Sequence, residues 1–195
     1  MGASIERDFE FHGGVYFENA FMMTLYNFTL YMEVNTDSIR EQNIAMERLK
    51  YLVEEVLDNT VFLGSTDKKL ANKFNDCGIK LCILPDEPYD QIIALSLMLK
   101  FNAICENKIK ILDIKFSSRL SDGVVFNEDY ETAKNTFVMN GWWNDSSPCL
   151  DYIQSTKKDK IVKLHKRGWN ELGLSWKEKK TEPTEIVFSI TDTDK

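Results

Sequence analysis

Two kinds of hydrophobic pattern alternate along the first two thirds of the chain. Over Phe21–Val34, apolar residues alternate with more polar ones, and this period of two is typical of a strand with one buried face. From Ser38 onward, apolar residues recur at helical spacing, and Ser38 with Glu41 matches the capping box that begins many helices. The pattern therefore predicts a long strand followed by an amphipathic helix that ends near Asp58.

Shorter segments continue this alternation as far as residue 126. Strands are predicted at 15–17, 60–63, 79–84, 108–116 and 124–126, and helices at 68–76 and 89–105. The segment 79–84 is apolar on both faces, which favours a central strand, and 89–105 is apolar around most of its circumference, which favours a deeply buried helix. The tripeptide His12-Gly13-Gly14 is interpreted as a turn.

Strands that alternate with helices predict an α+β fold, with a mixed, largely antiparallel sheet and helices packed on it. A ferredoxin-like split βαβ core is one candidate and a mixed α/β sandwich is another. The signals weaken in the C-terminal third, which is predicted to be irregular apart from helices at 129–137 and 158–172 and a last strand at 185–190 that could extend a sheet edge. We expect a single domain over 1–195, with its core at about 15–126 and a basic, Trp-rich extension at about 140–180 packed on that core.

Composition narrows the class of protein. The 195 residues carry a net charge of −7, with 43% hydrophobic and 28% charged residues, which is typical of a globular chain and excludes a disordered one. The chain begins without a secretion signal and has no apolar run long enough to span a bilayer, so we expect a cytoplasmic protein with no membrane partner. High Asn, Ile and Lys with little Pro is compatible with an AT-rich genome such as that of many tailed phages.

Motifs for catalysis or for cofactor binding are missing from the sequence. It has no phosphate-binding loop, no dinucleotide fingerprint, no nucleophile elbow and no zinc-protease motif, and its four cysteines fit no zinc or redox spacing. With only two histidines, no metal site and no cofactor are predicted. Carboxylates near a predicted strand pair leave an enzyme as a third hypothesis, based on Asp113, Asp122 and Asp129. Outward-facing strand and turn positions explain the same residues.

Charge is segregated along the chain. Residues 157–180 hold nine basic and three acidic groups, a net charge of +6 that leaves −13 on the other 171 residues. If 158–171 is helical, three of the cations share one face, and tryptophans lie within and before the basic segment. These residues form the candidate binding site: Trp142, Trp143, Lys160, Lys163, Arg167, Trp169 and Trp176.

The basic, Trp-bearing segment supports two functions and one structural alternative. The first hypothesis is a non-catalytic protein that binds another macromolecule, which is a protein partner or a second copy of this chain, because Trp and Arg are favoured interface anchors. The second is binding of single-stranded nucleic acid through 157–180, where cations neutralise phosphates and aromatic rings stack on bases. The structural alternative is a solvated helix whose charge complements an acidic body, with the tryptophans in the core.

Overall fold

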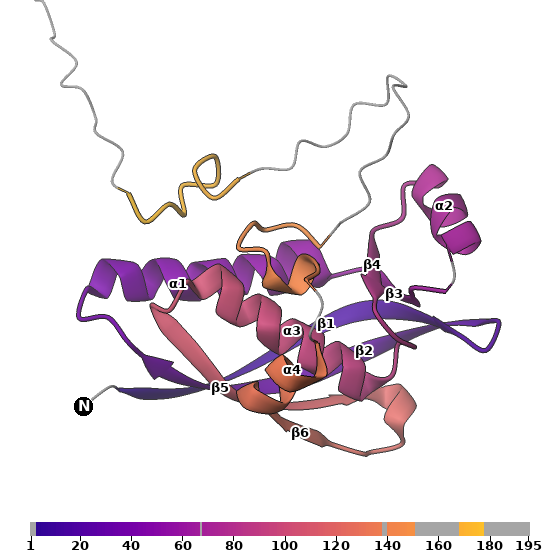
Figure 1. Ribbon diagram of the computed structural model, residues 1–195, viewed down its shortest axis with the longest axis horizontal. Coiled ribbons are helices and arrows are strands. Elements are labelled where there is room, and N and C mark those ends of the chain that lie inside the picture. Colours follow the sequence, from indigo (N-terminus) through magenta and orange to yellow (C-terminus); the bar gives the residue numbers. More distant parts are fainter. Residues whose placement is uncertain (1–2, 67, 138–139, 151–167, 178–195) are drawn as a thin grey trace, which may run out of the picture.

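The computed structural model describes residues 3–66, 68–137, 140–150 and 168–177. These residues form an α+β fold, as predicted, in which helices pack on one six-stranded sheet (Figure 1). The strands are β1 (Ser4–Phe17), β2 (Ala20–Val34), β3 (Thr60–Gly64), β4 (Leu81–Leu84), β5 (Ile109–Ser118) and β6 (Phe126–Asp129). The α-helices are α1 (Ile39–Tyr51), α2 (Lys68–Asp76), α3 (Asp90–Cys105) and α4 (Tyr130–Thr136). Shorter helical segments are η1 (Leu52–Leu57, a π-helix that continues α1), η2 (Arg119–Ser121) and η3 (Trp142–Asn144).

The sheet is mixed and largely antiparallel. Its strand order is β4-β3-β1-β2-β5-β6, in which β3 runs parallel to β1 and to β4, and the other neighbours are antiparallel. The ferredoxin-like candidate is wrong because the chain opens with two consecutive strands that form a central hairpin, whereas that fold repeats a βαβ unit. Among the strands that the structure describes, β4 lies at a sheet edge and not in the centre as its apolar sequence suggested.

The central hairpin is longer than its sequence pattern indicated. β1 begins at Ser4, well before the predicted residue 15, and pairs with β2 along its whole length. The two turn residues, Glu18 and Asn19, both have positive φ values, as the two-residue hairpin turns that match strand twist require. Gly13 and Gly14 lie inside β1 and not in a turn. A Cβ atom at Gly14 would come within 2.7 Å of the Phe21 ring, so the glycine leaves room for that ring.

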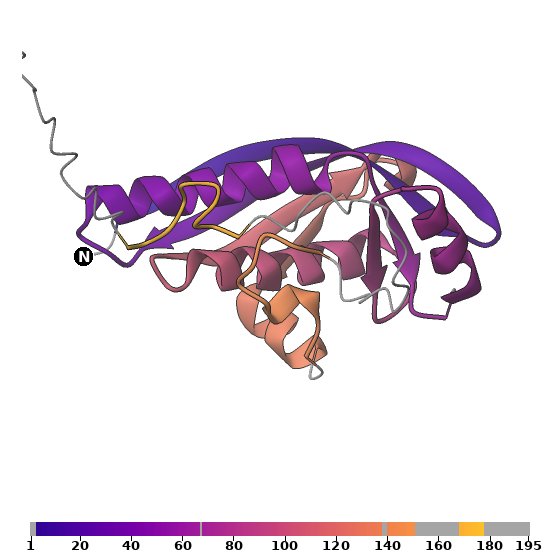
Figure 2. The same cartoon turned by 90° about the horizontal axis from the view of Figure 1, so that it is seen from above.

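The main core lies between the sheet and the helices α1, η1 and α3, which share one face of the sheet (Figure 2). The alternation predicted for β2 is confirmed, because Tyr26, Phe28, Leu30 and Met32 are buried toward these helices. α3 is deeply buried, as expected from its sequence. α1 begins at Ser38, whose side chain accepts a hydrogen bond from the backbone N–H of Glu41.

A second, smaller core lies on the opposite face of the sheet. There α2 covers the β4-β3 end through a cluster that includes Val61, Leu63, Ala71 and Leu81. Apart from Phe21 and Met23 near the β1–β2 turn, the rest of this face is polar and lacks a covering helix in the part of the chain that the structure describes; we call this polar part the open face. It displays Glu6, Asp8, Glu10, Asn27, Thr29, Tyr31, Asp113, Lys115 and Ser117. No helix among the described residues has the length and apolar character needed to cross a bilayer.

Candidate functional site

A buried lysine fixes the loop that carries two of the four tryptophans. Lys100 lies in the middle of α3 with an exposed fraction of 0%. Its ammonium donates hydrogen bonds to three loop carbonyls: those of Trp142 at 3.1 Å, Asp145 at 2.7 Å and Ser147 at 2.8 Å. Burial lowers the pKa of Lys100 from its usual value to about 8, although the Asp145 carboxylate opposes this shift. Three carbonyl acceptors use all three donors of the charged side chain.

Trp142 and Trp143 belong to the core that this loop closes. Both side chains are buried, and their rings meet edge to face at a centroid distance of 5.7 Å. The indole N–H of Trp142 donates to the Ile83 carbonyl at 2.8 Å, and Trp143 packs against Phe137. The two rings therefore join α3, β4 and the segment after α4 instead of facing solvent.

A buried arginine fixes the segment 168–177 on α1 (Figure 1). Arg48 is 2% exposed, and its guanidinium carbon lies 4.7 Å from the ring centroid of Trp169 and 3.9 Å from that of Trp176. The same guanidinium donates to the carbonyls of Ile104 and Leu174 and forms an ion pair with Glu106. Burial lowers the pKa of Arg48, an effect opposed by the ion pair with Glu106.

The binding residues predicted from the sequence fall into two groups: some are packed against the core, and the others lie outside the described residues. Trp169 is buried, and Trp176 is half-buried against the main core with the Arg48 guanidinium over its ring, so both rings take part in packing within the chain. Lys160, Lys163 and Arg167 lie outside the described residues, as do most of the helix predicted at 158–172 and the strand predicted at 185–190. Within the described part of that helix, residues 169–172 form turns. Binding through the basic segment, including binding of nucleic acid, stays a prediction.

The three carboxylates of the enzyme hypothesis are not gathered in one place. Asp113 and Asp129 are opposite each other on β5 and β6 and line a hollow of about 420 Å³ with Lys115, whereas Asp122 lies in an exposed turn. Asp129 already caps α4, where hydrogen bonds from the backbone and side chain of Thr132 lower its pKa. No group of three or more His, Cys, Asp or Glu residues suited to a metal ion occurs among the described residues.

Aromatic and apolar side chains lie near the turn between β1 and β2. Phe21 is 50% exposed, Met23 is 54% exposed and Tyr89 is 53% exposed, although all three are large and apolar. Half-buried rings pack against two of them. The ring centroid of Phe74 in α2 lies 6.3 Å from that of Phe21, and the ring centroid of Phe17 lies 5.0 Å from that of Tyr89. We call this the hairpin-tip surface and define it by Tyr16, Phe17, Phe21, Met23, Phe74 and Tyr89. Rings on both faces of the β1–β2 turn contribute to it.

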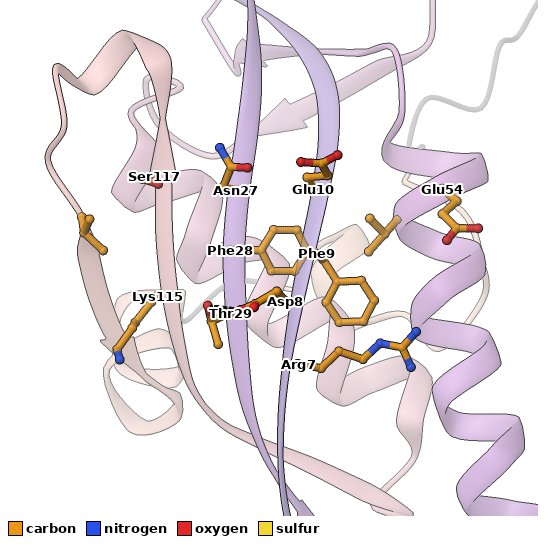
Figure 3. Close-up of a pocket in the computed structure, with 12 residues that line it drawn as sticks. Arg7, Asp8, Phe9, Glu10, Asn27, Phe28, Thr29, Glu54, Lys115 and Ser117 are labelled. Carbon is orange, nitrogen blue, oxygen red and sulfur yellow. Dashed lines mark hydrogen bonds between the residues drawn. The ribbon is translucent and has the colours of Figure 1, made fainter.

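A hollow of about 700 Å³ lies where β1 passes η1, at the opposite end of the hairpin (Figure 3). Figure 3 shows Arg7 and Phe9 between β1 and the helix, with Asp8 and Glu10 on the same strand. The Arg7 guanidinium lies 5.2 Å from the Phe9 ring centroid, and Phe9 stacks on Phe28. The hollow continues over the open face, where Thr29 donates to Asp8 at 2.6 Å. We call this hollow the edge groove.

Comparisons with known proteins add a distant likeness only. No protein-family model matches the sequence, and no match is found among curated proteins. An uncharacterised protein from Wolinella succinogenes aligns with a TM-score of 0.47 at 12% identity, over 66% of this chain and 98% of that one. A catalytic-residue mutant of 6-pyruvoyltetrahydropterin synthase from Plasmodium vivax aligns with a TM-score of 0.40 at 9% identity, over 66% of this chain and 99% of that one. These values carry no inference about function.

Sequence reasoning missed both surfaces that the structure reveals. Phe21 and Met23, the exposed side chains of β2 at the hairpin tip, lie in a strand with an alternating pattern. That pattern distinguishes the two faces of the strand, but it does not show which part of each face a helix covers. The edge groove depends on β1, whose first half also alternates, with Ile5, Phe9 and Phe11 between charged residues. That signal was available, and it was obscured because the two glycines were interpreted as a turn.

Proposed function

We propose that the protein binds another protein through the hairpin-tip surface. The observation that carries this proposal is the exposure of Phe21 and Met23, which are each about half accessible and lie together over Gly14, with Phe21 beside Phe74. Tyr89, which is also about half accessible, packs on Phe17 at the other face of the same turn. Single exposed apolar residues are ordinary, but a group of this kind marks an interaction site in soluble proteins. Aromatic residues and methionine are enriched at the centres of protein interfaces.

The geometry favours a protein over a nucleic acid as the partner of this surface. Its six defining residues carry no cation, whereas nucleic-acid binding requires basic groups that neutralise phosphates. The surface is also held in place: the Phe21 ring rests on the backbone of Gly14, and the hairpin turn has the conformation that matches its strands. A partner that presents an apolar surface would therefore meet side chains that lose little conformational freedom on binding.

Site-specific photo-cross-linking in the native host tests the proposal. A photoreactive phenylalanine analogue at position 21 should form an adduct of discrete mass with one protein, and Met23→Glu should reduce that adduct about tenfold, because a charge in the contact removes a central anchor. The same analogue at the exposed α1 residue Asn43 is the matched control. An adduct with a second copy of this chain would identify the partner as the chain itself. Equal labelling from positions 21 and 43 would refute the proposal.

A further inference from the structure

The edge groove borders a strand edge whose backbone groups have no partner among the described residues. β1 pairs with β3 only over Gly13–Val15, so its first half has β2 on one side and, within the described ranges, no strand on the other. Beyond that pairing, Asp58 and Asn59 take up the backbone N–H and carbonyl of His12, and the free edge begins there. Free edges of this length are sites where another strand can pair.

The direction of these backbone groups follows from the alternation along a strand. The Ala3 carbonyl accepts from Val34 and so faces β2, whereas the amide and carbonyl of His12 face away from β2. Since alternate residues of a strand point the same way, the amides and carbonyls of Glu6, Asp8 and Glu10 face the free edge. Six hydrogen-bonding groups are thus presented in a row.

The edge groove has the shape that an added strand requires, because it lies on both sides of this edge. Asp8 and Glu10 line it from the open face, and Arg7, Phe9 and Val53 line it from the face toward η1 (Figure 3). Side chains of an extended segment alternate between two faces, so such a segment would reach both parts at once. Charged residues on an edge protect against unwanted pairing, but that role does not require a hollow between the edge and the helix.

Charge specifies the chemistry of the occupant. Glu6, Asp8 and Glu10 lie along the edge on the open face, where Lys115 also lines the groove. On the helix side the exposed Glu54 is offset by Arg7, so the excess of negative charge lies on the open face. On the helix side, Phe9 and Val53 provide an apolar floor. We propose that the edge groove binds an extended segment of a partner protein by antiparallel strand addition. The segment has Lys or Arg residues toward the open face and apolar residues toward η1. This site is at the other end of β1 from the hairpin-tip surface and does not depend on that proposal.

Two isomeric peptides test the backbone pairing. Each has eight residues of alternating lysine and valine with an acetylated amino end, with N-methyl groups on the four valines in the first peptide and on the four lysines in the second. In antiparallel addition, the residues that face Asp8 on the open face also direct their N–H groups toward β1, so the lysine amides must be free. The full chain should bind the first peptide at least tenfold more tightly than the second in a fluorescence anisotropy titration. Equal affinities, or no binding of the first peptide, would overturn the proposal.

A protein variant tests the edge itself. Glu10→Pro removes one N–H from the free edge without removing a bond to β2, and proline is tolerated on edges of this kind. Glu10→Gln is the matched control because it loses the same charge and keeps the N–H. Relative to Glu10→Gln, Glu10→Pro should weaken the first peptide about fivefold, the loss of one hydrogen bond, with the circular dichroism spectrum unchanged. Equal affinity of the two folded variants would count against strand addition. If Glu10→Pro does not fold, the peptide isomers still decide the question.

Discussion

The buried ammonium of Lys100 makes a prediction that combines geometry with pH. Lys100→Met removes the charge and the three hydrogen bonds to the 142–147 loop while keeping a flexible apolar side chain of similar length. At pH 7.5 the variant leaves carbonyls of that loop without their donor, although the Trp142 carbonyl keeps a second bond from the Asp145 amide. We expect the free energy of unfolding to fall by about 2 kcal/mol at this pH.

The difference in free energy of unfolding between wild type and Lys100→Met should grow as the pH rises. The pKa of Lys100 is about 8 in the folded protein and about 10.5 in the unfolded chain, so between these values the unfolded state binds the proton more tightly. Stability therefore increases with pH in this window, by at most 1.4 kcal/mol per unit. Between pH 7.5 and 9.5 the two titrations together give wild type a gain of about 2 kcal/mol over Lys100→Met.

Two other buried groups lower the free energy of unfolding as the pH rises. The effect of Lys100 must therefore be measured as a difference between wild type and Lys100→Met at each pH. Burial raises the pKa of Tyr26, and it raises the pKa of Cys105 to about 12, so both groups stay neutral when folded and ionise more readily when unfolded. They lower stability as the pH rises toward 10 in wild type and variant alike, and they cancel in the difference. The contribution of Lys100 remains, together with its electrostatic interactions with Asp145, Cys149 and Cys82.

Urea unfolding followed by tryptophan fluorescence, under reducing conditions at pH 7.5, 8.5 and 9.5, measures this difference. Lys73→Met is the matched control, since Lys73 is exposed on α2, and its unfolding curves should follow wild type at each pH. If Lys100→Met and wild type keep a constant separation from pH 7.5 to 9.5, the ammonium is not desolvated as described and the reasoning is wrong.

Two further substitutions test how the tryptophan segments are held. Arg48→Met should lower the free energy of unfolding by about 3 kcal/mol, because the carbonyls of Ile104 and Leu174 lose their donor. Arg40→Ala removes a more exposed contact to the same segment and should lower it by under about 1 kcal/mol. Equal losses in urea unfolding would contradict the role of Arg48 in holding the segment 168–177. Trp142→Phe should cost about 2 kcal/mol through the lost bond to the Ile83 carbonyl and the smaller ring, and an unchanged urea midpoint would show that the bond contributes nothing.

The sequence predicted the class of fold well because hydrophobic periodicity reports burial directly. The helix that begins at Ser38, the buried helix α3 and the alternation of β2 all follow from local spacing. Strand order does not, because it depends on long-range pairing that no local pattern encodes. β4 shows the difference: its residues are apolar because α2 and α3 cover the end of the sheet, and the same composition would suit a central strand.

The candidate site was harder to predict than the fold because function here depends on which surfaces stay uncovered. Tryptophans near basic residues suggested a binding face, but Trp142, Trp143 and Trp169 are buried. The residues now proposed as anchors, Phe21 and Met23, belong to an ordinary amphipathic strand, and only the position of α2 shows that it leaves them exposed. A surface that is defined by what a helix fails to cover has no local sequence signature.

The two buried cations separate charge that serves structure from charge available to a partner. Sequence counting treats every Lys and Arg as part of a solvated surface, and in most positions that is correct. Lys100 and Arg48 differ because each is buried on its helix and donates to a later, irregular segment. Lys100 donates to three carbonyls of the 142–147 loop, and Arg48 donates to the Leu174 carbonyl as well as to Ile104 of α3. Burying a loop carbonyl without a hydrogen-bond donor costs free energy. A buried cation that donates to such carbonyls therefore holds in place a loop that has little apolar surface of its own. An isolated cation within an apolar helical run, as Lys100 is within 91–105, therefore predicts a docked loop better than it predicts a binding face, and the Lys100→Met comparison tests that contact. Arg48 stands next to Glu47 and near Lys50, so its burial has no such signal in the sequence.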